Sequence, residues 1–230
     1  MFKNSKHKAF TLSYDDGILS DIKTARICNR YGVKCTFNIN PGLAIRQGLW
    51  IYNGFEIKYL TKDALKEHLA GHEIASNSYS HPSLDVLTYE ECQNEMQLDK
   101  TLCTEWFGKA PVGMAYPMGT YSDTVVSVLE GLGYKYARTV KSTHSFDIQH
   151  DLLRFDPTCH HADEALFELA EEFIKADTST DMLFYVWGHS YEFDADGGYD
   201  RLDRLCRMMA ENDDVFCGTN AEVLLERSDD

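Results

Sequence analysis

Two adjacent carboxylates, Asp15 and Asp16, are the residues of this sequence best placed to do chemistry. They follow an apolar run and precede Gly17, so they lie where a predicted strand ends and the chain turns. Side chains alternate along a strand, but at such a turn both carboxylates can face one cavity. Burying two close carboxylates is costly unless a cation or a proton relieves the charge. Asp-Asp-Gly alone is also an ordinary turn sequence, so the interpretation depends on which residues join the pair.

Three later segments carry polar residues in the same position relative to a strand. Each follows an apolar, strand-like run, and they contain Asn77 with His81, residues 116–119, and His189. In a parallel α/β barrel the carboxyl ends of the strands open on one face, where active sites lie. Four separate segments that bring polar groups to one rim are much less expected by chance than any one of them.

Strand-like and helix-like segments alternate along the whole chain. The expected strands are 10–14, 33–39, 72–76, 111–116, 134–140, 152–158, 182–187 and 215–219, and the expected helices are 21–31, 61–70, 88–108, 122–132, 163–176 and 201–212. Thr88 and Glu91 form a predicted capping box. Residues 40–58 contain no predicted element and are long for a connection, which is typical of functional loops.

This alternation predicts the fold class α/β, with seven or eight parallel strands in a distorted (β/α) barrel related to the TIM barrel. The sequence has no glycine-rich phosphate fingerprint, which favours a closed barrel over an open, doubly wound sheet. Because no linker or internal repeat interrupts the pattern, we expect a single domain over residues 1–230.

The composition argues against several kinds of partner. A formal net charge of −15 disfavours nucleic acid and anionic membranes, since both require a basic surface. Seven cysteines without a CxxC pair favour reduced thiols over a disulfide framework. The sequence shows neither a secretion signal nor a run long enough to span a membrane. We therefore expect a cytoplasmic location and no membrane insertion.

Taken together and in this order, the four segments resemble the NodB-type polysaccharide deacetylase family of carbohydrate esterases. The resemblance covers nearly the whole chain, and its strongest parts are Ser13-Tyr14-Asp15-Asp16-Gly17, Ser80-His81-Pro82, Ala115-Tyr116-Pro117-Met118-Gly119-Thr120-Tyr121 and Val186-Trp187-Gly188-His189-Ser190-Tyr191-Glu192-Phe193. It implies a metal-dependent hydrolase that removes an acetyl group from an N- or O-acetylated sugar, oligosaccharide or polysaccharide.

The resemblance also implies a role for each matching residue. Asp15 matches the general base, and His189 matches the general acid that protonates the departing amine or alkoxide. Asp16 and His81 match ligands of one divalent metal ion, commonly zinc, which polarises the acetyl carbonyl and lowers the pKa of its bound water. The backbone N–H of Met118 matches the oxyanion donor.

The metal-ligand motif departs from the family pattern at Asn77. The family usually has a histidine at this position, and an amide oxygen is a harder and weaker ligand than imidazole. A site formed by Asp16, Asn77 and His81 would be less favourable to zinc and relatively better for manganese or a similar ion. Alternatively, the metal is lost.

The third motif departs from the pattern at Ala115, where the family often has an arginine that orients the catalytic carboxylate. We expect Arg154, on the sixth predicted strand, to replace it, because a guanidinium can pair bidentately with a carboxylate. Arg138 is the second choice. His160 and His161 follow that same predicted strand, and we expect them at the rim or in support of the site; a ligand role that offsets Asn77 is less favoured.

Aromatic and neighbouring apolar residues near the motifs are the expected sugar contacts, because amphipathic rings stack on sugar faces. The candidates are Trp50, Tyr79, Tyr116, Pro117, Trp187 and Tyr191. Core packing explains Trp187 equally well. The particular sugar, its linkage and the oligomeric state do not follow from the sequence.

Two other functions fit the same residues. Some relatives of this family resemble allantoinases, which act on small cyclic amides without the usual metal, and the substitution at Asn77 fits such an amidohydrolase. The other alternative is a degenerate domain that binds glycans without turnover. The intact Asp15 and His189 count against it, because binding alone needs neither.

Overall fold

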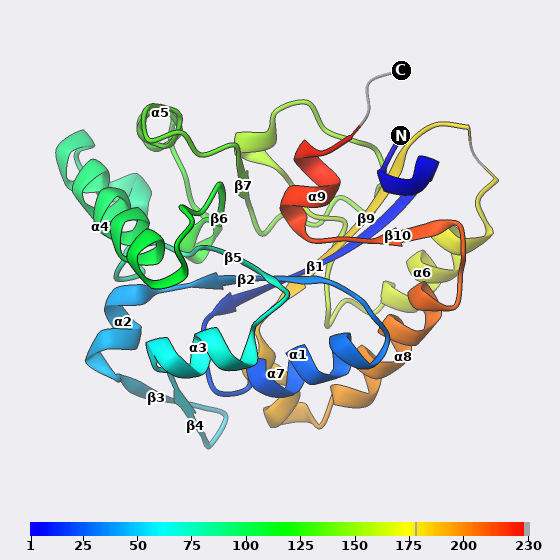
Figure 1. Ribbon diagram of the computed structural model, residues 1–230, viewed down its shortest axis with the longest axis horizontal. Coiled ribbons are helices and arrows are strands. Elements are labelled where there is room, and N and C mark those ends of the chain that lie inside the picture. Colours follow the sequence, from blue (N-terminus) through cyan, green and yellow to red (C-terminus); the bar gives the residue numbers. More distant parts are fainter. Residues whose placement is uncertain (178, 228–230) are drawn as a thin grey trace.

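A parallel β-sheet that curls strongly into a half-barrel forms the centre of the protein (Figure 1). The computed structural model describes residues 1–177 and 179–227. The sheet consists of β1 (Lys8–Asp16), β2 (Cys35–Ile39), β5 (Glu73–Ser76), β6 (Gly113–Ala115), β7 (Tyr136–Arg138), β8 (Cys159–His160), β9 (Met182–Gly188) and β10 (Val215–Cys217). Their order is β7-β6-β5-β2-β1-β9-β8, and β10 pairs with the first residues of β1.

The segment 155–160 brings the two edges of this sheet together. The N–H of Phe155 donates to the carbonyl of Ala137 (3.0 Å), and the N–H of Thr139 donates to the carbonyl of Phe155 (2.9 Å), so this residue bridges to β7. A few residues later, β8 pairs in parallel with β9. The expectation of an α/β fold with parallel strands in a distorted barrel is confirmed.

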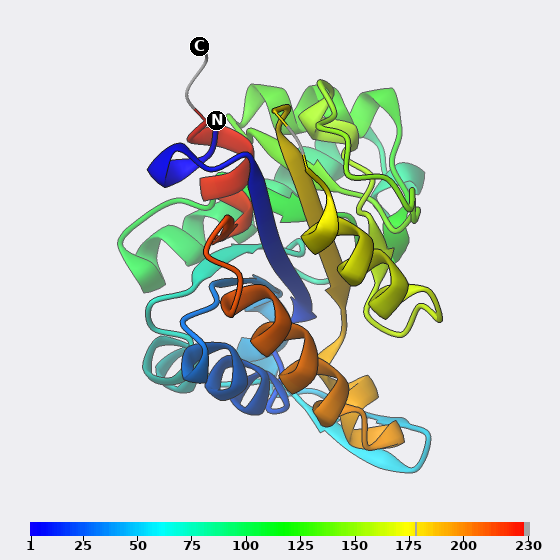
Figure 2. The ribbon, with the colours of Figure 1, turned by 90° about the vertical axis from the view of Figure 1, so that its right-hand side faces the viewer.

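Helices lie around the outside of the curled sheet (Figures 1 and 2). They are α1 (Asp21–Arg30), α2 (Pro41–Arg46), α3 (Lys62–His68), α4 (Tyr89–Phe107), α5 (Asp123–Gly131), α6 (Leu166–Lys175), α7 (Ser190–Asp196), α8 (Tyr199–Ala210) and α9 (Asn220–Leu225), with 3-10 turns η1 (Lys3–Ser5), η2 (Leu84–Val86), η3 (Pro117–Gly119) and η4 (Leu152–Arg154). The capping box of α4 is present as predicted, because the N–H of Glu91 donates to Thr88 Oγ1 and the N–H of Thr88 donates to Glu91 Oε2. None of the helices described in residues 1–177 and 179–227 is long and apolar enough to cross a membrane.

Residues 40–58 are ordered, contrary to the expected loop. They form α2 and then an antiparallel hairpin of β3 (Leu49–Tyr52) and β4 (Phe55–Lys58). The two turn residues, Asn53 and Gly54, have φ of +47° and +84°, as a tight two-residue hairpin requires. Asn-Gly between two apolar runs is the sequence signal that predicts this hairpin.

The expected strand over 152–158 is also wrong in its bounds. Residues Leu152–Arg154 form the turn η4, in which the N–H of Arg154 donates to the carbonyl of Asp151 (3.2 Å). Pro157 has no N–H to give to a strand ladder, and regular pairing begins only at Cys159.

The interior of the barrel holds a buried polar network beside an apolar cluster that includes Tyr136, Leu183 and Tyr185, whereas the space between the sheet and the helices is apolar. Asn220, at the start of α9, donates from Nδ2 to Ser13 Oγ (3.2 Å) and to the hydroxyl of Tyr185 (2.6 Å). Asn38 Nδ2 donates to the same Ser13 Oγ (2.9 Å) and to Asp15 Oδ1 (2.8 Å). Because a buried polar group is costly without a partner, this network fixes the inward side chains of β1 up to Asp15.

Candidate active site

Asp15 and Asp16 end β1, and both carboxylates are buried. Asp15 continues the inward alternation of the strand, in which Ser13 also points into the barrel. Asp16 has a φ of +87°, a left-handed conformation that is uncommon for a residue other than glycine. Such outliers cluster at functional sites. Here the left-handed conformation interrupts the regular alternation of side chains between the two faces of the strand, so that both carboxylates lie at its carboxyl end.

Arg138 makes the contact with Asp15 that we expected of Arg154. Its Nη2 donates to Oδ1 (2.7 Å) and Oδ2 (2.5 Å) of Asp15. The guanidinium is almost fully buried, and it lies 4.4 Å from the centre of the Trp187 ring. A buried charge is tolerated when it is paired and hydrogen-bonded, so Arg138 and Asp15 depend on each other.

The expectation that Arg154 orients Asp15 is therefore wrong. The Arg154 guanidinium instead bonds Asp151 (2.8 Å) and Asp123 (2.8 Å) at the surface. The physical reason is the turn η4, which removes Arg154 from the strand that would have pointed its side chain into the barrel.

Asp16, Asn77 and His81 come together as predicted for a ligand set. His81 Nε2 lies 3.8 Å from Asp16 Oδ1, and Asn77 Nδ2 donates to the same oxygen (3.1 Å). His81 has a φ of +60°, a second left-handed residue at this rim. Asn77 Oδ1 is buried and has no hydrogen-bond partner among the described residues. The amide now turns its nitrogen toward Asp16, and a rotation of the amide would be needed to bring Oδ1 to the same place. With that rotation, one carboxylate, one imidazole and one amide oxygen fit a single divalent cation.

The electrostatics of Asp16 favour the same conclusion. Burial raises the pKa of its carboxyl group, and the neighbouring Asp15 raises it further, while His189, His81 and the amide of Asn77 lower it. A cation at this position would remove the cost of burying the charged carboxylate.

His189 follows β9 and immediately precedes α7. Its Nε2 lies 4.0 Å from Asp15 Oδ2, and its Nδ1 lies 3.4 Å from Glu192 Oε1. Burial alone would lower its pKa, but the carboxylates of Glu192, Asp16 and Asp15 outweigh this effect and raise the pKa to about 9. The imidazole therefore carries its proton at neutral pH.

Glu192 is the residue of this site that the sequence analysis did not assign. Its carboxylate lies beside three imidazoles, with His160 Nε2 at 3.2 Å and His161 Nε2 at 2.8 Å from Oε2. Although burial raises the pKa of Glu192, these histidines and His189 hold it well below its usual range. The signal for this residue is the spacing His-x-x-Glu at the start of a helix, since the N–H of His189 donates to Glu192 Oε2 (3.3 Å) in a capping box.

Met118 lies in η3, directly after β6. Its φ is +57°, and its side chain is exposed. The peptide of this turn thus lies at the same end of the barrel as the other motifs, where the resemblance expects an oxyanion donor.

Tyr191 lies beside His189 and connects it to Trp50, and both Tyr191 and Trp50 are expected sugar contacts. Tyr191 stacks on the His189 ring at 5.0 Å, and it also contacts Trp50 at 5.8 Å and Tyr52 at 4.7 Å between ring centres. Both hairpin residues point inward, whereas Ile51 between them is exposed. Figure 2 shows the hairpin and α7 at the end toward which β1 and β9 point.

The other expected sugar contacts have little free surface. Tyr116 is 2% exposed and donates its hydroxyl proton to the carbonyl of Leu153, and Pro117 is buried. Trp187 is 8% exposed and packs against Arg138, as expected if it serves core packing and not sugar binding. Tyr79 is half-buried, with its ring close to Gly42.

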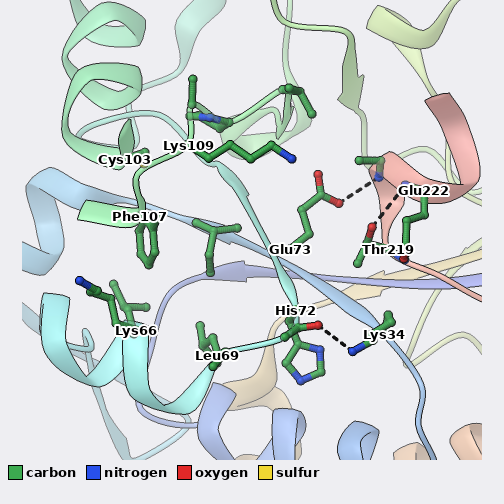
Figure 3. A pocket seen from close by; sticks show the side chains of 18 of the residues that line it. Lys34, Lys66, Leu69, His72, Glu73, Cys103, Phe107, Lys109, Thr219 and Glu222 are labelled. Carbon is green, nitrogen blue, oxygen red and sulfur yellow. Dashed lines mark hydrogen bonds between the residues drawn. The ribbon is translucent and has the colours of Figure 1, made fainter. Parts of the chain in front are cut away.

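A cavity of about 490 Å³ lies at the opposite end of the barrel, around the start of β5 (Figure 3). Two of its charged groups are paired within the protein, although His72 Nε2 is buried without a hydrogen-bond partner among the described residues. Lys34 Nζ donates to the carbonyl of Gly71 (2.9 Å), and Glu73 Oε2 accepts from the N–H of Ala221 (2.9 Å). None of the motif residues lines it, so the cavity does not belong to the candidate site.

The fold and the order of these residues around the rim define a protein of the NodB-like α/β class. The family model described as "Polysaccharide deacetylase" matches residues 2–137, more than half of the chain. The chain therefore belongs to the polysaccharide deacetylase family.

Individual relatives share part of the chain. It is 27% identical over 143 residues to YxkH of Bacillus subtilis, described as a polysaccharide deacetylase, over 60% of this chain and 47% of that protein. It is also 27% identical over 143 residues to a chitin deacetylase of Pestalotiopsis sp, over 62% of this chain and 44% of that protein. The chain spans about half the length of these curated relatives.

Among solved structures, a CE4 family pseudoenzyme from Bacillus anthracis is similar with a TM-score of 0.63 and 15% identity. The match covers 98% of this chain and 68% of that chain. At this level of identity the likeness concerns the fold.

Proposed function

We propose that this protein is a metal-dependent hydrolase that removes an acetyl group from an N- or O-acetylated carbohydrate. The observation that carries the proposal is the arrangement around Asp15. This buried carboxylate is held by Arg138, and His189 Nε2 lies 4.0 Å from its Oδ2. A fixed carboxylate can remove a proton from water, and a protonated imidazole near it can deliver another proton to the leaving group.

Asp16, His81 and the amide oxygen of Asn77 are the residues that would hold the metal ion. When bound, a divalent cation supplies polarisation of the acetyl carbonyl and lowers the pKa of water. The more oxygen-rich ligand set supports manganese or a similar ion beside zinc, which the family resemblance favours.

The remaining steps belong to side chains and backbone of this chain. Asp15, oriented by Arg138 and Asn38, accepts the proton of the attacking water. The backbone N–H of Met118 donates to the oxyanion that develops on the acetyl group. His189 then gives its Nε2 proton to the departing nitrogen or oxygen, while Nδ1 stays directed at Glu192.

Acetate release by two variants tests this division of labour. Asp15→Asn and His189→Ala should each lower kcat on an acetylated chitooligosaccharide by at least about 100-fold, the usual contribution of a general base or acid. The matched control is Asp123→Asn, the same chemical change at an exposed carboxylate that pairs with Arg154; it should keep the wild-type rate. Full activity in both site variants would refute the mechanism.

A metal-independent amidohydrolase that acts on a small molecule, as in allantoinase-like relatives, is the second candidate. One observation favours it: the hydrogen bond from Asn77 Nδ2 gives Asp16 a partner without any cation. Hydrolysis of a cyclic amide that survives exhaustive chelation would support this function over the first. A glycan-binding domain without turnover would instead show sugar affinity and no hydrolysis with any metal.

A further inference from the structure

A group of three potential metal ligands lies beside the candidate active site and is separate from Asp16, Asn77 and His81. We propose that His160, His161 and Glu192 form a second divalent-cation site. The proposal does not depend on the deacetylase function, since it concerns cation binding by other residues. Two imidazoles and one carboxylate are a ligand set that suits zinc, cobalt and iron, with open positions for water or another ligand.

The three ligand atoms are already close together. His160 Nε2 and His161 Nε2 lie 3.2 Å and 2.8 Å from Glu192 Oε2, and the three atoms lie within 4.8 Å of one another. Ligands bound to one cation at about 2.0–2.2 Å are about 3.3–3.6 Å apart in a tetrahedral arrangement, so His161 Nε2 and Glu192 Oε2 would have to separate by about half an ångström. Small side-chain movements would therefore suffice to enclose an ion.

The nitrogen of His161 is the strongest sign of a missing partner. The residue is 2% exposed, and its Nε2 makes no hydrogen bond of acceptable direction with any described residue, despite its short distance to Glu192. An unpaired buried polar atom is costly. A cation bound to Nε2 and Oε2 would give Nε2 a partner, while Oε2 already accepts from the N–H of His189.

The surrounding structure holds the His161 ring in place. The ring stacks on Phe193 at 4.1 Å between ring centres. A Cβ at Gly188 would lie 2.2 Å from its Nδ1, so only glycine at that position leaves room for the ring. The hydroxyl of Tyr14 lies 3.3 Å from the same Nδ1 and can accept a hydrogen bond from Nδ1–H when Nε2 binds a cation. Such an outer partner is typical of ligating histidines.

His160 must change its ring contacts to join the site. Its Nδ1 accepts a hydrogen bond from the N–H of Ala162 (3.1 Å), which places the ring proton on Nε2. Ligation through Nε2 moves that proton to Nδ1 and breaks this bond. The ring is 24% exposed, so it has room to reorient. An ion on Oε2 of Glu192 would leave Oε1 directed at His189.

The test is to measure how many cations the full chain binds. Calorimetric titration with Zn²⁺ gives the number and affinity of the bound ions, and the absorption spectrum with Co²⁺ reports on their ligands. The wild-type protein should bind two ions. His160→Ala and the isosteric Glu192→Gln should each lose one ion, with its affinity lowered by more than about 100-fold, because even outer partners change affinity about 10–100-fold. Asp16→Asn should lose the other ion and keep this one.

The control is His144→Ala, which removes an exposed histidine that contacts Asp163 at 2.7 Å elsewhere in the chain. It should bind two ions with wild-type affinity. The proposal is overturned if His160→Ala and Glu192→Gln, folded by circular dichroism, keep the wild-type stoichiometry and Co²⁺ spectrum. It is also overturned if the wild-type protein binds a single ion that only Asp16→Asn removes. This experiment measures cation binding and not acetate release. A protein that releases no acetate could therefore still bind a cation at His160, His161 and Glu192, and the two proposals can fail independently.

Discussion

At the scale of single residues, the buried pair of Arg138 and Asp15 is the contact on which the candidate site depends. Both oxygens of Asp15 accept from one nitrogen of Arg138, and neither side chain has significant access to water. Removal of one partner would leave an uncompensated buried charge, which typically costs about 3–5 kcal/mol.

Arg138→Gln should therefore lower the free energy of unfolding by about 3–5 kcal/mol in urea titrations. Arg138→Lys keeps the charge and should lose less. Arg154→Gln is the matched control, because it removes the same group from an exposed ion pair with Asp123, and such pairs contribute little. Equal losses from Arg138→Gln and Arg154→Gln would show that the buried pair has no special role.

Residue types at the rim were predictable from the sequence, but the partner of Asp15 was narrowed only to two arginines, with Arg154 preferred and Arg138, the actual partner, as the second choice. Asp15, Asp16, His81 and His189 could be placed because each follows a strand, and parallel strands open on one face. Arg138 lies in the middle of the chain with no motif around it, and it reaches Asp15 only through the curvature of the sheet. Tertiary packing determines that contact, so local sequence could not select it over Arg154.

At the scale of elements, the hairpin of β3 and β4 packs near His189, the candidate general acid, through a chain of aromatic contacts. Trp50 contacts Tyr191, and Tyr191 stacks on His189. The hairpin thus supports one wall of the site, although β3 and β4 form a separate two-stranded sheet.

Trp50→Ala should raise KM for an acetylated oligosaccharide by about 2–10-fold, as expected for the loss of one aromatic contact of about 0.5–1.5 kcal/mol. The neighbouring Ile51→Ala is the control, since Ile51 points outward and is 63% exposed. Steady-state kinetics on the two variants make the comparison. An unchanged KM in Trp50→Ala would exclude the hairpin from substrate binding.

The hairpin also shows why some elements escaped prediction. Its Asn53-Gly54 turn is a local signal that was present in the sequence and can be recognised without the structure. The helix α7 is different, because it is only seven residues long, and a short helix has too few turns for a clear periodic pattern. The capping box of α4 was predictable because its two residues bond each other locally.

At the scale of the whole molecule, buried carboxyl groups couple stability to pH. Asp99 is fully buried in α4, where burial raises the pKa of its carboxyl to about 7, despite hydrogen bonds from Ser76 and Tyr134. The unfolded chain releases this proton near pH 4, whereas the folded protein keeps it until about pH 7. The unfolded state therefore binds fewer protons over this range, and stability falls as pH rises through it.

Asp99→Asn should gain stability relative to the wild type as pH rises, with a larger difference at pH 8 than at pH 5 in urea unfolding. Asparagine can still accept from the Tyr134 hydroxyl, which lies 3.1 Å from Asp99 Oδ2. The exposed Asp147→Asn is the control and should differ from the wild type equally at both pH values. A difference for Asp99→Asn that does not change with pH would contradict this account.

The order of the motifs around the barrel was predictable from the whole chain, since alternating strands and helices allow few topologies. The closure of the barrel through segment 155–160 was not. It depends on pairing of only one or two residues with each neighbouring strand, which is too short to leave a pattern in sequence.

We propose that metal-dependent removal of acetyl groups takes place at the rim formed by Asp15, Asp16 and His81. The most direct measurement is acetate release from acetylated chito- and xylooligosaccharides by chelated protein, before and after addition of Zn²⁺ or Mn²⁺. We predict no release after chelation, recovery with the added ion, and no recovery in Asp15→Asn. Absence of acetate release with every ion, or release by Asp15→Asn equal to that of the wild type, would contradict the account.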